Sequence, residues 1–354
     1  MKLPRQTTPS LRATPSFQRG IVLTGGGTAG HVVPHLALLP HLKKHFDKIY
    51  YIGSHEGIEK KIIAERMEYY SVATAKLRRS FDVRNLAIPF KLMKGIADAK
   101  RILKKLKPDI VFSKGGFVAY PVVRAAAKLG IPVVAHESDM TMGLANRMSA
   151  KYCKVICTTF KSKYVHTGSP IREEIYNGIG IKIQKRHGFK EGKNLLVFGG
   201  SLGATKINEA VKVADLSAYN VVHICGKGKQ VGIASQARND YVQLEYVNDI
   251  QNYFAWADVV VSRAGSNALC ELLVLRKPTL FIPLATGRGD QIENAKEVLK
   301  HKAAAVLWEE DLTAQSLQAR VNEVYKNRDS YASMGELDGT KKIAEIIVKH
   351  SLDS

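Results

Sequence analysis

The sequence predicts an α/β protein with two doubly wound, parallel-sheet domains that face each other across a cleft. Its 354 residues are enough for two hydrophobic cores, at roughly 150 residues per domain. Short β-branched and aromatic runs alternate with longer helix-like stretches, which is typical of parallel sheets covered by helices on both faces. A strand that runs into a GGxxG turn occurs at residues 21–30 and again at 195–203, which indicates two domains of similar design.

Apolar runs that end in turn residues mark the strands of both sheets. The segments predicted as strands are Gly20–Thr24, Lys48–Gly53, Asp109–Ser113, Pro132–His136, Val155–Thr159, Asn194–Phe198, Asn220–Cys225, Asp258–Ser262 and Pro278–Pro283. The alternation restarts after Thr167-Gly168-Ser169-Pro170, which is typical of a turn or linker. We therefore predict a flexible basic tail over residues 1–20, an N-terminal domain over 21–168, a C-terminal domain over 169–335 and a final segment over 336–354.

The chain is strongly basic, with 53 Lys and Arg against 32 Asp and Glu and a formal net charge of +21. Such an excess attracts phosphates, nucleic acid or anionic lipid surfaces. Nucleic acid is not an expected partner, because no helix-turn-helix pattern, zinc-finger spacing or aromatic RNA-binding signature is recognisable. No run approaches the ~20 apolar residues of a membrane span. The four cysteines lack metal-type spacing, which fits a reducing cytosol.

Glycine-rich turns follow three predicted strands, at Gly25–Gly30, Gly115-Gly116 and Gly199–Gly203. Glycine lets the backbone approach a ligand closely, and the N–H groups of the following helix attract anions, so such turns suit diphosphates. The GxGxxG spacing of the first turn would also fit a dinucleotide-binding enzyme. Such enzymes usually carry an acidic residue at the end of the second strand to bind the ribose, but residues 50–54 contain none, and Glu56 lies beyond the end of that strand. Because ligands bind at the carboxyl ends of parallel strands, we expect all three turns at one cleft.

His31 follows the first glycine turn and is expected near the first turn of the next helix. An imidazole at this place could act as a general base near neutral pH. It could equally serve only to hydrogen-bond the loop or a phosphate. The residues alone leave both interpretations open.

Residues 76–107 carry eleven Lys or Arg against two Asp, a large share of the basic excess. Apolar residues at helical spacing from Leu92 to Leu106 are expected to face the core. The apolar cluster just before or at the start of this helix is surrounded by cations and is predicted to insert into an anionic leaflet. The residues predicted to meet the membrane are Leu86, Ile88, Phe90, Lys91 and Lys94.

Several longer motifs occur in order along the chain. They are Gly25–Pro34 (GGGTAGHVVP), Gly115–Pro121 (GGFVAYP), His136-Glu137, Gly168–Arg172 (GSPIR), Gly199–Asn208 (GGSLGATKIN), Arg263–Glu271 (RAGSNALCE) and Gln291–Ala295 (QIENA). Over residues 21–350 this series resembles the MurG family of glycosyltransferases. The resemblance implies the GT-B fold, with a Rossmann-like acceptor domain, a Rossmann-like UDP-sugar domain and a last helix that returns to the first domain.

The resemblance also implies the reaction. N-acetylglucosamine (GlcNAc) would pass from UDP-GlcNAc to the C4 hydroxyl of the N-acetylmuramyl (MurNAc) residue of undecaprenyl-diphospho-MurNAc-pentapeptide, called lipid I, to give lipid II in peptidoglycan synthesis. We expect a single displacement with inversion, in which His31 activates the hydroxyl and Glu137 is the reserve candidate for the base. Departing UDP would be stabilised by Gly199–Gly203 and Arg172. No DxD-type pair is present, so neither a metal nor another cofactor is expected.

Individual binding residues are carried over from the family motifs. Gly27, Gly115 and Gly116 are expected at the acceptor diphosphate. Glu271 is expected to hold the ribose hydroxyls and the backbone near Val247 the uracil. The full set of expected donor contacts is Thr28, Ala29, Gly30, Arg172, Gly200, Ser201, Val247, Glu271, Gln291 and Asn294.

The sequence departs from the family pattern at one position of the expected site, and it leaves other functions open. Ser138-Asp139 stands where the family often has Gln-Asn, which leaves the role of Asp139 undetermined. A UDP-sugar 2-epimerase or a glycolipid glycosyltransferase would share the donor motifs, and a non-catalytic UDP-sugar-binding subunit would not depend on His31. The expected partners are UDP-GlcNAc, lipid I and an anionic surface at the cytoplasmic face of the bacterial cell membrane, with other cell-wall synthesis proteins as further candidates.

Overall fold

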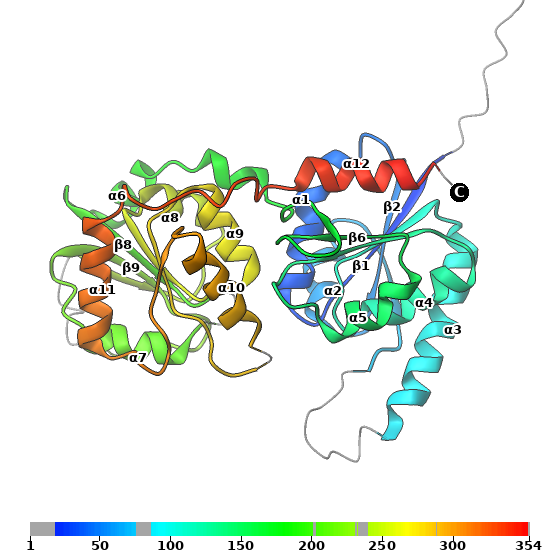
Figure 1. Ribbon diagram of the computed structural model, residues 1–354, viewed down its shortest axis with the longest axis horizontal. Coiled ribbons are helices and arrows are strands. Elements are labelled where there is room, and N and C mark those ends of the chain that lie inside the picture. The colour runs from blue at the N-terminus through cyan, green and yellow to red at the C-terminus, as the bar shows by residue number, and fades with distance from the viewer. Residues whose placement is uncertain are drawn as a thin grey trace, which may run out of the picture.

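The computed structural model describes residues 18–75, 86–200, 203–230, 232, 240–287 and 289–352. Figure 1 shows two α/β domains side by side, with the C-terminal domain on the left. Each is a parallel sheet with helices on both faces, so the predicted fold class is confirmed.

The N-terminal sheet has seven parallel strands within the described residues. From edge to edge they are β3 (Glu68–Val72), β2 (Lys48–Ser54), β1 (Gly20–Thr24), β4 (Ile110–Ser113), β5 (Val133–Glu137), β6 (Val155–Thr158) and β7 (Val165–His166). All residues of β1 and β4 are buried, because helices cover both faces of the sheet. The helical segments are η1 (Ala29–His31), α1 (Val33–Leu42), α2 (Ile58–Ile63), α3 (Ile88–Leu106), α4 (Ala119–Lys128), α5 (Leu144–Ser149) and η3 (Ala150–Tyr152).

The C-terminal sheet has six parallel strands in the described part of the chain. They are β10 (Tyr241–Leu244), β9 (Tyr219–Ile224), β8 (Lys193–Phe198), β11 (Val259–Ser262), β12 (Thr279–Phe281) and β13 (Ala305–Val306). Numbered within each domain, the strands of both sheets begin 3-2-1-4-5-6, the order of a doubly wound fold. The helical segments are η4 (Glu173–Asn177), α6 (Ile181–His187), α7 (Thr205–Val213), α8 (Ile250–Trp256), α9 (Ser266–Val274), α10 (Asp290–Lys300) and α11 (Ala314–Lys326).

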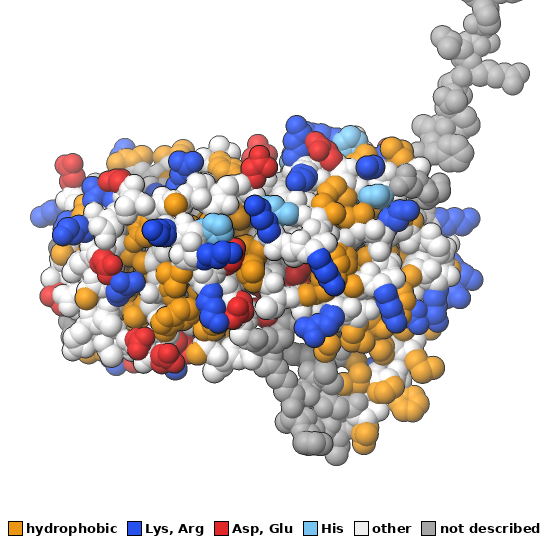
Figure 2. Space-filling view, viewed as in Figure 1, with side chains coloured by type: hydrophobic (Ala, Val, Ile, Leu, Met, Phe, Trp, Pro, Cys, Tyr) orange, Lys and Arg blue, Asp and Glu red, His pale blue; other side chains and the backbone are white. Residues whose placement is uncertain are grey.

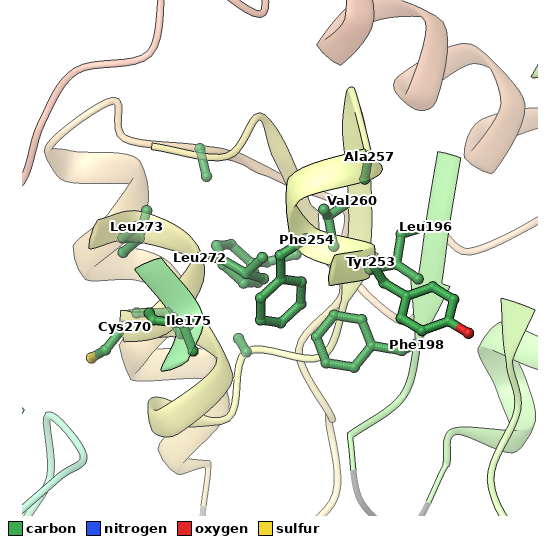
Figure 3. Packing of buried hydrophobic residues seen from close by; sticks show 14 of the residues in the cluster. Ile175, Leu196, Phe198, Tyr253, Phe254, Ala257, Val260, Cys270, Leu272 and Leu273 are labelled. Carbon is green, nitrogen blue, oxygen red and sulfur yellow. The ribbon is translucent and has the colours of Figure 1, made fainter. Parts of the chain in front are cut away.

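A dense core fixes α8 and α9 on one face of this sheet. The rings of Phe198 and Phe254 pack at a tilt with their centroids 5.6 Å apart. Figure 3 shows Cys270 and Leu272 of α9 in the same buried cluster. The helix that carries the predicted ribose ligand is therefore held by close packing.

The chain crosses between the domains twice, and the two crossings run side by side. The Ser169 N–H donates to the Leu337 carbonyl at 2.7 Å, and the Gly339 N–H donates to the Ser169 carbonyl at 2.8 Å. Helix α12 (Thr340–His350, red in Figure 1) then buries Ile343 and Ile347 in the N-terminal core, against α1. The C-terminal end of the chain therefore belongs structurally to the first domain.

All the predicted strands are observed, with ends that differ by one or two residues. The sequence did not indicate β3, β7, β10 and β13. These four are the edge strands of the two sheets.

Candidate active site

The segment after β1 of the first sheet meets the start of α9, which follows β11 of the second sheet. β1 pairs with β4, and β8 pairs with β11, at the centre of each sheet. The loops at the carboxyl ends of these pairs lie where the strand order reverses, which is the usual ligand site of a doubly wound sheet. The Asn267 side chain, at the start of α9, donates to the Gly30 carbonyl across the gap at 3.4 Å. This contact places the Thr28–Gly30 segment against the first turn of α9.

The two glycine turns of the N-terminal domain are packed against each other around His31, the last residue of η1. Gly116 has φ +79°, and a Cβ there would overlap the Gly26 carbonyl oxygen and lie 3.0 Å from His31 Cδ2. Only glycine fits this position. Gly115, beside it, also has a positive φ and packs against Asn146.

The His31 ring is half-buried and makes one defined hydrogen bond. Its Nδ1 lies 3.1 Å from the Lys114 carbonyl oxygen, so Nδ1 carries the proton and Nε2 keeps a lone pair. Burial lowers the pKa of His31, and the charge of Lys114 lowers it further, against the opposing effect of Glu137. The imidazole is therefore neutral at pH 7, the form that can accept a proton.

Glu137 ends β5, and its carboxylate is fully engaged. Oε1 accepts from the two backbone N–H groups that follow it in the chain, at 2.9 and 3.2 Å. Oε2 accepts from the Gly143 N–H and from the Asn146 side-chain amide, both at 2.9 Å. Four hydrogen-bond donors thus hold the Glu137 carboxylate in place and occupy both of its oxygens. The geometry favours His31 over Glu137 as the base, with Glu137 acting on His31 through its charge.

Lys114 is a residue of this site that the sequence motifs did not indicate. It follows β4 directly, its side chain is almost wholly buried, and its ammonium donates to His136 Nδ1 at 2.6 Å and to Ser138 Oγ. Burial lowers the pKa of Lys114 to about 8, although Glu137 and Asp139 act in the opposite direction. The sequence did contain an indication of this position, because a lysine directly after a short apolar strand must lie at the carboxyl edge of the sheet.

The N–H of Gly27 is already used inside the domain. It donates at 3.2 Å to Oε2 of Glu59, a completely buried carboxylate of α2 that also accepts from the Ser54 N–H at 3.1 Å. Gly27 can therefore serve an acceptor diphosphate through the shape of its loop rather than through this N–H. Glu59 is a second residue that the motifs did not indicate.

The glycine turn of the C-terminal domain follows β8 and precedes α7. Gly200 has φ +80°, and a Cβ added there would meet open space, so this turn presents bare backbone. Such a surface suits the close approach of a phosphate. Ser201, which was expected to contact the donor, lies outside the described residues.

Two expected donor residues bind each other. The Glu271 carboxylate accepts from Arg172 Nε at 2.8 Å and from Arg172 Nη2 at 2.9 Å. Glu271 is buried on α9, and Arg172 immediately precedes η4 after the first crossing. A bidentate pair of this kind is strong and directional. The two residues that were expected to contact the donor therefore form one unit.

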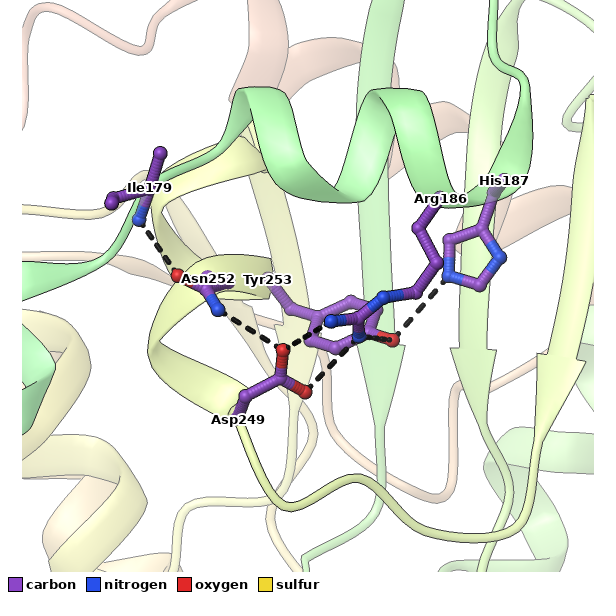
Figure 4. A network of polar contacts seen from close by, with 6 residues as sticks. All are labelled: Ile179, Arg186, His187, Asp249, Asn252 and Tyr253. Atoms are coloured by element: carbon purple, nitrogen blue, oxygen red, sulfur yellow. Dashed lines mark hydrogen bonds and ion pairs between the residues drawn. The ribbon is translucent and has the colours of Figure 1, made fainter.

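Val247 lies in the loop between β10 and α8, and a polar network fixes the far end of this loop (Figure 4). The Asp249 carboxylate accepts from the Arg186 guanidinium at 2.7 and 3.2 Å and from the Asn252 amide at 3.0 Å. Asn252 Oδ1 in turn accepts from the Ile179 N–H at 2.8 Å. The network joins α6 to α8, and so it holds the loop of the expected uracil contact.

The expected donor residues of α10 have partners within the protein. Asn294 is completely buried; its Oδ1 accepts from the Met140 N–H at 2.9 Å, and its Nδ2 donates to Asp139 at 3.0 Å. Gln291 Oε1 accepts from the Leu284 N–H at 3.0 Å. Asn294 thus joins the two domains, and Asp139, where the family often has asparagine, is its partner.

Among the residues that the structure describes, no group of three or more His, Cys, Asp or Glu side chains could hold a metal ion. None of the described helices combines the length and apolarity that a membrane span needs. All four cysteines are free thiols.

Sequence profiles of one enzyme family match both domains. The Glycosyltransferase family 28 N-terminal domain matches residues 21–158, and the Glycosyltransferase family 28 C-terminal domain matches residues 194–349. The chain belongs to glycosyltransferase family 28. The predicted enzyme class is confirmed.

Curated relatives of this family 28 chain align over nearly its whole length. A protein of Clostridium botulinum (strain Loch Maree / Type A3) is 48% identical over 351 residues, which are 94% of this chain and 99% of the relative. A protein of Clostridium perfringens (strain 13 / Type A) is 45% identical over 349 residues, 93% of this chain and 98% of the relative. Both are named UDP-N-acetylglucosamine--N-acetylmuramyl-(pentapeptide) pyrophosphoryl-undecaprenol N-acetylglucosamine transferase. The predicted membership of the MurG family is thereby confirmed.

Solved structures share the arrangement of the two domains. MurG of Acinetobacter baumannii matches with a TM-score of 0.73 at 24% identity, covering 94% of this chain and 99% of that one. UDP-GlcNAc 2-epimerase of Neisseria meningitidis matches with a TM-score of 0.59 at 13% identity, covering 95% and 99%. At these identities the likeness shows the fold alone, which is GT-B as predicted.

Proposed function

We propose that this family 28 glycosyltransferase transfers GlcNAc from UDP-GlcNAc to the C4 hydroxyl of the MurNAc residue of lipid I and so makes lipid II for peptidoglycan. The observation that carries the proposal is the 45–48% identity, over nearly the full length, to relatives named for this transfer. The site supports it, because one domain carries a neutral imidazole directly after a glycine turn, and the other domain carries the Arg172–Glu271 pair.

His31 is the base in this proposal. Its Nε2 takes the proton of the acceptor hydroxyl while the hydroxyl oxygen bonds to C1 of GlcNAc and the bond from C1 to the diphosphate oxygen of UDP breaks. The oxygen attacks from the side opposite the leaving group, which inverts the anomeric centre. The hydrogen bond from Nδ1 to the Lys114 carbonyl fixes the ring so that Nε2 is the basic nitrogen.

Departing UDP carries new negative charge on its diphosphate. The turn after β8 and the N-terminus of α9 offer backbone N–H groups, and Arg172 offers a cation. Arg172, proposed to contact the diphosphate, and Glu271, proposed to contact the ribose, are the two partners of one ion pair. Loss of either residue should therefore weaken both contacts. Fixed N–H dipoles and this cation can stabilise UDP without a metal ion, and we propose that the reaction needs none.

The first turns of α3 support a peripheral site at the cytoplasmic face of the cell membrane. Leu86, Phe90 and Met93 are 78%, 75% and 69% exposed beside exposed Lys91 and Lys94, whereas Ile88 is half-buried. Figure 2 shows hydrophobic side chains gathered at the lower right, over the region where α3 begins. An apolar patch ringed by cations suits an anionic leaflet. The basic residues of 76–85 that were counted with this segment lie outside the described residues.

The membrane proposal is tested by co-sedimentation with anionic and zwitterionic vesicles. Phe90→Glu should lower binding to anionic vesicles several-fold, since it removes apolar area and adds a repelled charge. Val213→Glu is the matched control, because Val213 is 74% exposed on α7 of the other domain. Equal loss in both variants, or binding that ignores salt and lipid charge, would contradict the proposed surface.

The reaction itself is tested with labelled UDP-GlcNAc, with and without a short-chain analogue of lipid I. We expect UDP release and a disaccharide of inverted configuration only when the acceptor is present. UDP release without acceptor would favour the 2-epimerase alternative, whose fold this chain shares. Binding of UDP-GlcNAc without turnover would favour a non-catalytic subunit.

A further inference from the structure

Lys114 is a buried cation that has no carboxylate in direct contact within the part of the chain that the structure describes. Its side chain is 1% exposed, and its two hydrogen-bond acceptors, His136 Nδ1 and Ser138 Oγ, are neutral. A buried ammonium is unfavourable unless it is paired, so stability does not explain a lysine at this place. Its position at the carboxyl edge of β4, one residue before the glycine turn that packs on His31, points to a role in the reaction.

Lys114 holds His31 through the main chain. The His31 Nδ1–H donates to the Lys114 carbonyl at 3.1 Å, and the Lys114 N–H donates to the Thr24 carbonyl at 2.9 Å. The residue is thus tied to β1 and to the ring of the candidate base at the same time. Any shift of Lys114 would turn the imidazole.

The side chain of Lys114 links this point to the crossing between the domains. His136 Nε2–H donates to the Gly168 carbonyl at 2.9 Å, so its Nδ1 is the acceptor for the Lys114 ammonium. The crossing at Gly168 is crowded, since a Cβ there would lie 2.5 Å from the Leu337 carbonyl oxygen of the returning segment. A continuous chain of hydrogen bonds therefore runs from His31 through Lys114 and His136 to the paired crossings.

Charges on both sides of His31 compete for its protonation. The carboxylates of Glu137 and Asp139 favour the imidazolium, while the Lys114 ammonium disfavours it. Without the ammonium only burial of the ring would oppose the two carboxylates, and the pKa of His31 would rise. The titratable groups that act on Lys114 or His31 from the elements around them are His35 of α1, His136 and Glu137 of β5, Asp139 of the next loop, Cys157 of β6 and Cys270 of α9.

We propose that Lys114 is a positioning residue of the transfer reaction, which holds His31 as a neutral imidazole with Nε2 free for the acceptor hydroxyl. This inference rests on the proposed function, in which His31 is the base. The carbonyl of Lys114 sets the tautomer and the ring orientation, and its ammonium acts with the burial of the ring against the charges of Glu137 and Asp139.

The test compares Lys114→Met, which keeps the length of the side chain and removes its charge, with the wild type. The acid limb of the kcat/KM profile, where the base becomes protonated, should move up by about one pH unit. The pKa of His31, read by NMR from its ring signals without any substrate, should rise by the same amount. The KM for UDP-GlcNAc should stay unchanged, because Lys114 belongs to the acceptor domain.

Lys277→Met is the matched control, since Lys277 is also partly buried, has a pKa lowered by burial and donates to the Ala257 carbonyl at 3.0 Å in the other domain. It should leave both pH readouts unchanged. A fall in activity of Lys114→Met with an unmoved acid limb and an unmoved His31 pKa would overturn the proposal and leave Lys114 a structural residue.

A measurement on the wild type covers the case in which Lys114→Met does not fold. The Lys114 amine should titrate near pH 8, and the ring signals of His31 should respond in the same pH range. A His31 ring that is insensitive to this titration would overturn the proposal. If His31→Ala kept full turnover while the wild-type His31 ring signals still followed the titration of Lys114, His31 would not be the base. The electrostatic effect of Lys114 on His31 would still be established.

Discussion

Glu309 offers a sharp test of how the donor domain is held together. Its side chain is 1% exposed, and one oxygen binds Arg263 at 2.5 Å while the other binds Lys206 at 3.1 Å. Arg263 opens the RAGSNALCE motif and also donates to the Ile282 and Pro283 carbonyls. The pair thus fixes the turn between β11 and α9, the helix that carries Glu271.

Glu309→Ala would leave the Arg263 guanidinium buried without its counter-ion. Removal of one partner of a buried pair destabilises a protein by about 3–5 kcal/mol. For a domain of this size, that loss corresponds to a fall of roughly 6–20 °C in Tm. Burial raises the pKa of Glu309, but Arg263 and Lys206 outweigh it and hold that pKa below the usual value. The ion pair therefore contributes its full stability at pH values above the pKa of Glu309 in the unfolded chain. This stability is lost as the pH falls through the lower pKa of Glu309 in the folded protein.

Differential scanning calorimetry of the variants measures this effect directly. Lys206→Ala is the control within the same network, because the Lys206 side chain is 64% exposed and a surface pair contributes about 0–1 kcal/mol. We expect Glu309→Ala to lower the transition of the C-terminal domain strongly and Lys206→Ala hardly at all. Equal effects of the two substitutions would refute the assignment of the Arg263–Glu309 pair as the internal support of the donor site.

Three further outcomes are expected. Glu271→Gln should weaken UDP-GlcNAc binding by about 10- to 100-fold, since a charged hydrogen-bond acceptor for the ribose and for Arg172 is lost; unchanged calorimetric binding would contradict the assignment. His35 is buried between aromatic rings and its pKa is lowered by burial to about 3, so its NMR signals should stay those of neutral imidazole at pH 5. In the unfolded chain this histidine takes up its proton near pH 6.5, well before it does so in the folded state. The free energy of unfolding should therefore fall by up to about 5 kcal/mol between pH 6.5 and 3. A His35 that titrates near pH 6 in the folded protein would exclude this effect. EDTA should leave turnover unchanged, and restoration of activity by a divalent ion after EDTA treatment would contradict the metal-free proposal.

The central strands could be predicted from the sequence because both faces of a parallel sheet are covered. β1 and β4 are buried at every residue and therefore read as unbroken apolar runs. Edge strands β7 and β13 are only two residues long, too short for a pattern to show. Edge strands β3 and β10 differ physically from the central ones: only Val72 of β3 is buried, and β10 is half-exposed throughout. Their sequences mix polar and apolar residues, so periodicity does not separate them from loops.

The positions of the glycine turns and of His31 after strand ends could be predicted, but the pairing of the side chains around them could not. Glycine turns and His31 follow strand ends, and strand ends of a parallel sheet share one edge. The Arg172–Glu271 pair joins residues 99 positions apart, and the Asp139–Asn294 contact joins residues 155 positions apart across the two domains. Such contacts depend on side-chain direction and domain packing, which no local pattern encodes.

Single-turnover transfer by His31→Ala tests the central claim most directly. Enzyme loaded with labelled UDP-GlcNAc is mixed with the lipid I analogue, the disaccharide is followed by rapid quench, and the affinity for UDP-GlcNAc is measured separately by calorimetry. We predict that the transfer rate falls by about 100-fold or more, the usual range for loss of a general base, while donor affinity changes little. A variant that transfers GlcNAc at the wild-type rate would contradict the account of His31 as the base.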